Sequence, residues 1–475
     1  MSVAANEDAL NKEPNKETLN WWVLAAVGTG TFMSALDGSI ANTVLPILMH
    51  VLHGSVASVE WVVTVYLLVS SALVLSAGRW GDLHGHKPMY LTGFAVFIVG
   101  SALCGLAQSI PILVAMRGVQ ALGATMLFAS SPAIVTLNFP ARVRGQALGM
   151  QATLTYLGLS AGPILGGWLT THLSWHAVFY INVPVGLLAL GLSTRFIPND
   201  VPRTSSAKFD VLGAVLFASG LIALLTALNQ GHAWGWVSAG ILALLASSAG
   251  LLTGFVLWER KAQSPMLDFG LFRERSFTAA SVSAALSFIS LNGLLFLLPF
   301  YLITGRGLSA ASAGLVIAAL PTAMALVAPI SGWLSDRIGS AIPATTGMVL
   351  LAIGTLLLSR LGPHTPLHLA AAALALSGVG IGVFLSPNNS SLMGSAPRSQ
   401  QGIAAAIRAT ARNLGNVLGI GIVGAVFNSI LARSLPHFGV FPAIHAGLLT
   451  VCLAACLGAV ASAVRGRPRL NVVAS

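Results

Sequence analysis

The sequence carries very little charge for its length. Asp, Glu, Lys and Arg make up 8% of the 475 residues, against 55% hydrophobic residues and a mean hydropathy of +0.84. A soluble domain of this size has about a quarter charged residues, because its surface faces water. The chain therefore lacks the charge to coat a soluble globule.

Other signatures are absent as well. The three cysteines, Cys104, Cys452 and Cys456, lie in apolar segments, which favours buried free thiols over a redox or metal site. The sequence holds neither a GxxxxGK[ST] phosphate loop nor zinc-type His/Glu spacing, so we expect no ATP-driven pump, enzyme, metal or other cofactor. Residues 1–20 are polar and of mixed charge, unlike a signal peptide.

Long apolar runs make up most of the sequence. Many are near twenty residues, the length at which a helix spans the hydrocarbon core of a bilayer. The 50 glycines sit within these runs, where small residues allow helices to pack closely. We predict fourteen transmembrane helices, at residues 21–46, 59–78, 89–107, 111–136, 146–169, 177–196, 211–229, 237–258, 277–302, 310–333, 343–361, 367–391, 403–431 and 442–464.

The basic residues support this count. With residues 1–20 in the cytoplasm, most of the 24 Lys and Arg residues fall in inner loops or tails. Only Arg306, Arg360 and Arg433 fall in outer loops. This asymmetry follows the positive-inside rule, so we expect both termini in the cytoplasm. It also accounts for the net charge of +11 without a nucleic-acid partner.

A weak internal repeat divides the chain. Residues 78–82 follow the second run and residues 332–337 follow the tenth, each segment combining glycine with an acid and preceding a further glycine, Gly85 or Gly339. Many secondary transporters are built from internal repeats. We expect six-helix bundles at 21–197 and 277–464, two inserted helices with flanking loops at 198–276, and cytoplasmic tails at 1–20 and 465–475.

Two charged residues stand out inside the predicted helices. Asp37 lies in the first helix, where a carboxylate at membrane depth costs about 2.5–3.5 kcal/mol on insertion scales. Arg117 lies in the fourth helix and needs a partner, for which Asp37 is the candidate in the same half. Protonating Asp37 would weaken that pair, so we predict that both couple transport to protons. The alternatives are an acid that anchors a helix end and a static ion pair.

Further residues indicate where helices could bend or separate during transport. In the fifth run, the small residues and the proline allow close helix contact and bending: Gly158, Gly162, Pro163, Gly166 and Gly167. In the loop at 78–88, Asp82 could bind a base and the N-terminal end of a neighbouring helix, which would hold an inner gate shut; the alternative is a solvated acid in a tight turn. The gate candidates are Gly78, Asp82, Gly85, Lys87, Asp336 and Arg337.

Polar residues in the runs are candidates for a substrate cavity. These are Gln151, Tyr156, Asn292 and Arg412. Arg412 lies one turn after Arg408, and the two could bind an anionic group or pair across the bundle.

Together these segments resemble the major facilitator superfamily, specifically its fourteen-helix drug:proton antiporters, over nearly the whole chain. Residues 37–46, 78–87 and 117–123 resemble the motifs of the first helix, of the loop after the second and of the fourth helix. Residues 158–167 match the antiporter motif of the fifth helix, and 175–186 resemble the usual start of the sixth. The sequence departs from the family pattern at Leu83, His86, Ala121 and His176.

The resemblance implies an all-α polytopic membrane protein with two six-helix bundles plus two extra central helices. It implies that the acid and the arginine carry proton coupling, and that hydrophobic, often cationic compounds leave through a central cavity in exchange for protons. We therefore expect a multidrug exporter in a bacterial cytoplasmic (inner) membrane that works by alternating access and confers drug resistance. Its partners would be a small-molecule substrate, protons and lipid, with a periplasmic adaptor as a further, untested one. The alternatives are a dedicated exporter of one metabolite or self-made antibiotic, and a transport-inactive sensor.

Overall fold

The computed structural model describes residues 21–53, 56–199, 208–308, 310–438 and 440–465. Over these ranges the chain is almost entirely helical and forms no strand. The predicted tails lie outside the described residues, except for Arg465.

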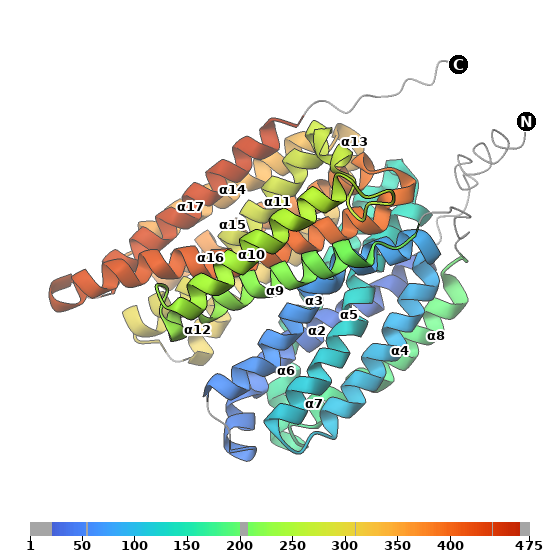
Figure 1. Cartoon of the computed structure of the whole chain (residues 1–475). Coiled ribbons are helices and arrows are strands. Elements are labelled where there is room, and N and C mark those ends of the chain that lie inside the picture. The colour runs from blue at the N-terminus through green and yellow to red at the C-terminus, as the bar shows by residue number, and fades with distance from the viewer. Residues whose placement is uncertain (1–20, 54–55, 200–207, 309, 439, 466–475) are drawn as a thin grey trace, which may run out of the picture.

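The first half of the chain forms one group of helices. They are α2 (Trp21–Val51), α3 (Val56–His84), α4 (His86–Gly105), α5 (Ile110–Asn138), the short turn η1 (Ala141–Val143), α6 (Arg144–His172), α7 (Ala177–Tyr180) and α8 (Asn182–Phe196). Helix α2 packs on α6 and α8, and α5 packs on α3 and α4. Figure 1 shows this group below the rest of the molecule.

The second half forms a similar group. It consists of α11 (Arg275–Pro299) with its π-helical continuation η3 (Phe300–Gly305), α12 (Ala310–Ile317), α13 (Ala319–Ile338), α14 (Ala341–Ser359), α15 (Leu367–Ser395), η4 (Arg398–Gln400), α16 (Gln401–Phe438) and α17 (Phe441–Ala463). Helix α14 packs on α15 and α17, and α11 packs on α16 and α17. Helices of the two halves meet where α13 packs on α6 and α16 packs on α3 and α5.

Two helices connect the halves. Helices α9 (Val211–Trp234) and α10 (Ala239–Glu259) form a hairpin, followed by the turn η2 (Phe269–Arg273). Helix α9 packs against α3 of the first half and α16 of the second, where Leu221 and Leu225 join Leu68 in a small apolar cluster. The hairpin therefore covers the line where α3 and α16 meet.

The described helices include thirteen that are long and apolar enough to cross a membrane, against the fourteen predicted. The difference is α6, whose sequence contains several glycines, threonines and glutamines. Helix α6 packs on α2 and α13, while Leu157, Ile164 and Trp168 on another face are exposed. Its polar residues find partners inside the protein, since Gln151 donates to Ser131 and Thr153 to the Ala325 carbonyl. We count α6 as the fourteenth membrane helix by its position.

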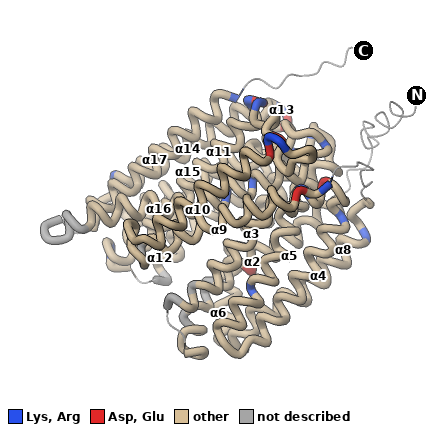
Figure 2. The backbone as a smooth tube through the Cα atoms, viewed as in Figure 1, with Lys and Arg blue, Asp and Glu red and all other residues tan. Residues whose placement is uncertain are grey.

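Charged residues gather at one end of the molecule, where α3 and α13 end and α4 and α14 begin (Figure 2). We call this the charged end. A large apolar cluster there combines residues of both halves, including Ile134 and Leu148 with Met393 and Ile403. At the opposite end, the cluster around Leu113 and Phe179 contains residues of the first half only. The two halves are thus joined at the charged end.

The turns at the charged end correct one expectation. Helix α3 continues to His84 and α13 to Ile338, so Asp82 and Asp336 lie in final helical turns and not in loops. The chain then reverses at Gly85, with φ of 101°, and at Gly339, with φ of 84°. These left-handed values favour glycine at both positions. Ending each helix there places both acids on ordered backbone.

Candidate functional site

Asp37 and Arg117 form a buried ion pair inside the first half. Asp37 lies on α2 and Arg117 on α5, and both side chains are at most 1% exposed. Arg117 Nη1 donates to Asp37 Oδ2 over 2.8 Å. It also donates to Gln120 Oε1 over 2.6 Å, and Arg117 Nε donates to the Val62 carbonyl of α3 over 3.2 Å. The structure therefore brings together the two residues predicted to couple protons.

Two amides complete the surroundings of the carboxylate. Gln120 Nε2 and Asn182 Nδ2 donate to Asp37 Oδ1 over 2.9 and 2.8 Å. Gln120 also donates to Ser101 Oγ of α4 over 2.7 Å. The carboxylate thus accepts three hydrogen bonds, and the network ties α2 to α3, α4, α5 and α8. Such a network supports a charged Asp37 in an otherwise apolar interior.

The sequence prediction missed Gln120 and Asn182. Both lie within segments that resemble family motifs, yet neither carries a charge that would draw attention in an apolar run. Gln120 follows Arg117 by three residues, a spacing that places both side chains on one helix face. That spacing could have identified Gln120, whereas nothing local connects Asn182 to Asp37.

Glycines of α6 press that helix against the helix that carries Asp37. A Cβ atom at Gly158 would lie 2.5 Å from the Phe32 carbonyl oxygen, and one at Gly162 would lie 2.5 Å from Ser39 Cβ. Ser39 Oγ donates to the Leu159 carbonyl over 2.8 Å. Gly167 has no neighbour within 4 Å of such an added atom. Only part of the motif therefore forms the contact with α2. Gly166 is buried, and the side chain of Pro163 lies outside the described residues.

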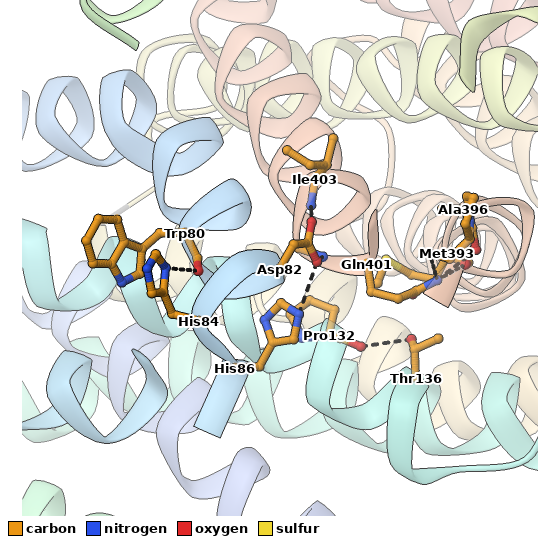
Figure 3. A network of polar contacts seen from close by, with 12 residues as sticks. Trp80, Asp82, His84, His86, Pro132, Thr136, Met393, Ala396, Gln401 and Ile403 are labelled. Carbon is orange, nitrogen blue, oxygen red and sulfur yellow. Dashed lines mark hydrogen bonds and ion pairs between the residues drawn. The ribbon is translucent and has the colours of Figure 1, made fainter. Parts of the chain in front are cut away.

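At the charged end, Asp82 binds the first turn of a helix in the other half. Its carboxylate oxygens accept from the backbone amides of Gly402 over 2.7 Å and Ile403 over 3.0 Å, at the start of α16 (Figure 3). His86 Nε2 lies 3.2 Å from Asp82 Oδ1. A carboxylate suits this position because unpaired amides and the helix dipole make a helix N-terminus positive.

Asp336 makes the corresponding contact in the opposite direction. It accepts from the backbone amides of Gly145 and Gln146, both over 2.8 Å, at the start of α6. The final turn of α13 in the second half is therefore attached to the first turn of α6 in the first half. Together with Asp82, this gives two reciprocal attachments between the halves.

Glycines allow the helices to cross beside both acids. A Cβ atom on Gly78 would lie 2.3 Å from the Gly402 carbonyl oxygen, and one on Gly332 would lie 2.2 Å from the Gly145 carbonyl oxygen. Any side chain at these points would force the helices apart. The two crossings close the charged end in this conformation.

The other gate candidates make contacts within one half. Lys87 Nζ donates to the Thr194 carbonyl of α8 within the first half, over 3.2 Å. The Arg337 guanidinium lies 4.0 Å from the ring centre of Trp333, on its own helix. Gly85 forms the turn after α3.

The predicted cavity residues occupy several places. Gln151 Nε2 donates to Ser131 Oγ over 2.5 Å, linking α6 to α5. Tyr156 of α6 packs in an apolar cluster of the second half. Asn292 Nδ2 donates to Asn416 Oδ1 over 2.6 Å, linking α11 to α16. Arg412 of α16 lies over the Phe128 ring of α5, 4.6 Å from its centre. The four predicted cavity residues therefore lie on three different helices, α6, α11 and α16.

A family model and several known proteins match most of this chain. The family model described as Major Facilitator Superfamily matches residues 27–420. The riboflavin transporter RibZ of Clostridioides difficile (strain 630) is 35% identical over 418 residues, which are 88% of this chain and 89% of RibZ. The multidrug resistance protein Stp of Mycobacterium tuberculosis is 33% identical over 416 residues, which are 87% of this chain and 77% of Stp.

A solved structure is similar in fold. The crystal structure of the human organic anion transporter MFSD10 (TETRAN) superposes with a TM-score of 0.70, covering 94% of this chain and 100% of that chain. Its sequence is 16% identical, so the likeness concerns the fold alone.

Proposed function

Because the chain belongs to the Major Facilitator Superfamily and is a membrane transporter, we propose that it exports small hydrophobic or amphipathic compounds in exchange for protons. The observation that carries this proposal is the buried carboxylate of Asp37, which accepts from Arg117, Gln120 and Asn182. A proton on Asp37 removes its charge and one acceptor position, so this network has to rearrange. Export of this kind would confer drug resistance.

The two ends of the molecule support an alternating-access cycle. Asp82 and Asp336 close the charged end, and the apolar cluster at the opposite end belongs to one half only. The basic residues favour the charged end as the cytoplasmic one, in a bacterial inner membrane with both termini inside. The conformation described here then faces outward. Six helices on either side of the α9–α10 hairpin would act as the moving bundles.

In our proposal, protonation of Asp37 links the buried ion pair to the opening of the charged end. A proton that arrives from outside binds Asp37 and releases Arg117. The first half repacks, because the network joins five of its helices. The attachments at Asp82 and Asp336 then break, and the substrate binds from the cytoplasmic side. Loss of the proton to the cytoplasm restores the ion pair and returns the protein to the outward-facing conformation.

Efflux from cells tests the proposal. A panel of fluorescent dyes is loaded into cells that express the wild type or Asp37→Asn, with and without a protonophore. Wild-type efflux should stop with the protonophore, and the variant should reach the membrane but export nothing. Asp210→Asn is the matched control, since Asp210 accepts from Gly213 at the start of α9, away from the ion pair. Wild-type efflux by Asp37→Asn would show that Asp37 does not couple protons.

A dedicated transporter of a single compound is the second candidate. It is favoured by the 35% identity to a protein named a riboflavin transporter, over most of both chains. Competition in everted vesicles separates the two functions. Inhibition by many unrelated compounds supports the multidrug function, and inhibition by one chemical series supports the dedicated function.

A further inference from the structure

Two arginines of the second half lie side by side at the interface with the first half. Arg408 and Arg412 are one turn apart on α16, which packs on α3 and α5 of the first half. At 1.5 Å per residue, they lie about 10 and 16 Å along the helix from its start at the charged end. Since a hydrocarbon core is about 30 Å thick, this places both near mid-membrane depth.

The contacts of these arginines do not neutralise their charge. The Arg412 guanidinium stacks on Phe128, and its Nε donates weakly to Asn413 Oδ1 over 3.4 Å. Arg408 Nε is buried without a hydrogen-bond partner. Over the described residues, the only arginine–carboxylate ion pair is that of Arg117 with Asp37.

The second half contains no unengaged carboxylate that could pair with Arg408 or Arg412. Residues 277–464 contain a single acidic residue, Asp336, which is bound to the start of α6 at the charged end. In the first half, Asp37 is engaged by Arg117. Charged groups inside a membrane protein pair with one another or mark the path of a substrate or ion, because a charge without a partner is costly there. The side chains of Arg408 and Arg412 are only partly exposed. A neighbouring pair of positive charges lacks such compensation here.

We propose that the substrate supplies the missing negative charge, so that this transporter carries organic anions. A carboxylate, sulfonate or phosphate group binds between Arg408 and Arg412, as two guanidinium groups one turn apart can share one anionic group. The aromatic or apolar body of the substrate packs beside Phe128 and Tyr156. This inference rests on the proposed export function and reverses the cationic substrate class that the family resemblance implies.

Aromatic side chains frame the two arginines. Phe128 of α5 lies under the guanidinium of Arg412, 4.6 Å from its ring centre, and Tyr156 of α6 packs in an apolar cluster of the second half. Tyr66 of α3 lies under the guanidinium of Arg117, 4.5 Å from its ring centre, and Asn413, the residue after Arg412, donates to Ser71 Oγ of the same helix over 2.8 Å. Helix α3 therefore contacts both the proton-coupling pair and the part of α16 that carries the proposed anion site. Anion binding and the charge of Asp37 can influence each other through this helix.

If Arg408 and Arg412 instead stabilised the fold, replacing them would lower the melting temperature. This can be measured on the protein without ligand. Arg408→Gln and Arg412→Gln remove uncompensated charge, so neither should lower the melting temperature of the purified full chain in nanodiscs. Arg117→Gln removes a paired charge and should lower it clearly, because Asp37 is left buried and unpaired. If the two α16 variants lower the melting temperature as much as Arg117→Gln, the arginines are structurally paired and the inference is wrong.

Binding is tested with two probes that share a ring system and differ in charge. Carboxyfluorescein is anionic and rhodamine 123 is cationic. We expect carboxyfluorescein to raise the melting temperature of the wild type and rhodamine 123 to leave it unchanged. Each Gln variant should bind carboxyfluorescein about tenfold more weakly, the effect of losing one charge-assisted hydrogen bond. Arg412→Lys should retain part of the binding, and Arg360→Gln, an exposed position at the end of α14, should retain all of it. The inference is overturned if carboxyfluorescein fails to stabilise the wild type, or stabilises it and the Gln variants equally.

Transport of the same probes into everted vesicles separates this inference from the proposed function. Proton-driven uptake of carboxyfluorescein that is lost in Arg408→Gln and Arg412→Gln supports both. Proton-driven uptake of rhodamine 123 without arginine-dependent binding of carboxyfluorescein overturns the anion site and leaves proton-coupled export standing. Arginine-dependent binding of carboxyfluorescein without any response to the proton gradient supports the anion site and overturns the proposed coupling.

Discussion

Asp82 and Asp336 hold the two halves together through the same contact made in opposite directions. Asp82 ends α3 and accepts from the first amides of α16, and Asp336 ends α13 and accepts from the first amides of α6. Each acid thus attaches the end of one helix to the start of another in the opposite half. The internal repeat of the sequence appears in the structure as a reciprocal pair of attachments.

Replacing these acids should open the charged end. Asp82→Asn and Asp336→Asn each lose the charge and one of two acceptor oxygens, so we expect each to shift the equilibrium toward the open state by about 1–3 kcal/mol. The double variant should shift it further. Spin labels at Ala141 and Ser399, on opposite halves at this end, report the change as a longer distance. Glu274→Gln, at an exposed position before α11 whose side chain makes no cap hydrogen bond, should behave as the wild type. An unchanged distance distribution in both single variants would exclude this gating role.

Within the glycine motif of α6, one position should be sensitive and another tolerant. Gly162→Ala would place a Cβ atom 2.5 Å from Ser39 Cβ, so the helix that carries Asp37 has to move. We expect a loss of stability of about 1–3 kcal/mol, together with reduced efflux. Gly167→Ala meets nothing within 4 Å and should be neutral or slightly stabilising, since alanine favours the helix. Thermal unfolding in detergent and dye efflux measure both effects. Equal behaviour of the two variants would contradict the packing argument.

Asn182 should contribute to transport even though it carries no charge. Asn182→Ala removes one of the three donors to Asp37, and we expect efflux to fall about tenfold, which corresponds to one hydrogen bond to a charged group. Asn138→Ala is the control, because Asn138 donates only to the Ile134 carbonyl of its own helix. Initial rates of dye efflux, normalised to the amount of protein in the membrane, provide the measurement. If both variants export equally well, Asn182 has no part in the network's function.

Arg117 should not be replaceable by lysine. Its guanidinium donates to Asp37, Gln120 and a backbone carbonyl from a planar fork, which a single ammonium group cannot reproduce. We expect Arg117→Lys to reach the membrane but to export at a rate at least about tenfold lower, given the hydrogen bonds to charged groups that are lost. Arg195→Lys, at an exposed position near the end of α8, should export normally. Full activity of Arg117→Lys would mean that the positive charge alone is sufficient.

The sequence predicted helices where the signal lies along the chain. Apolar runs long enough for a bilayer marked each membrane helix, and a helix forms within such a run because its backbone must satisfy its own hydrogen bonds. Asp37 and Arg117 were found for a similar reason, as charges are rare and costly within such runs. The contrast between α6 and the other helices shows the limit of this signal. Its polar side chains find partners on α5 and α13, as Gln151 donates to Ser131 and Thr153 to the Ala325 carbonyl, and composition does not reveal such contacts.

Membrane character, helix positions and the identity of the charged pair were therefore determined by the sequence alone, because hydropathy and charge are properties of each segment. The tertiary structure decided which segments meet. Asp82 and Gly402 are 320 residues apart, and Asn182 reaches Asp37 across 145 residues. Such contacts depend on the angles and close approaches of packed helices, which glycines such as Gly78 and Gly332 permit. Only the tertiary structure also showed that, among the side chains it describes, Arg408 and Arg412 form no ion pair with a carboxylate.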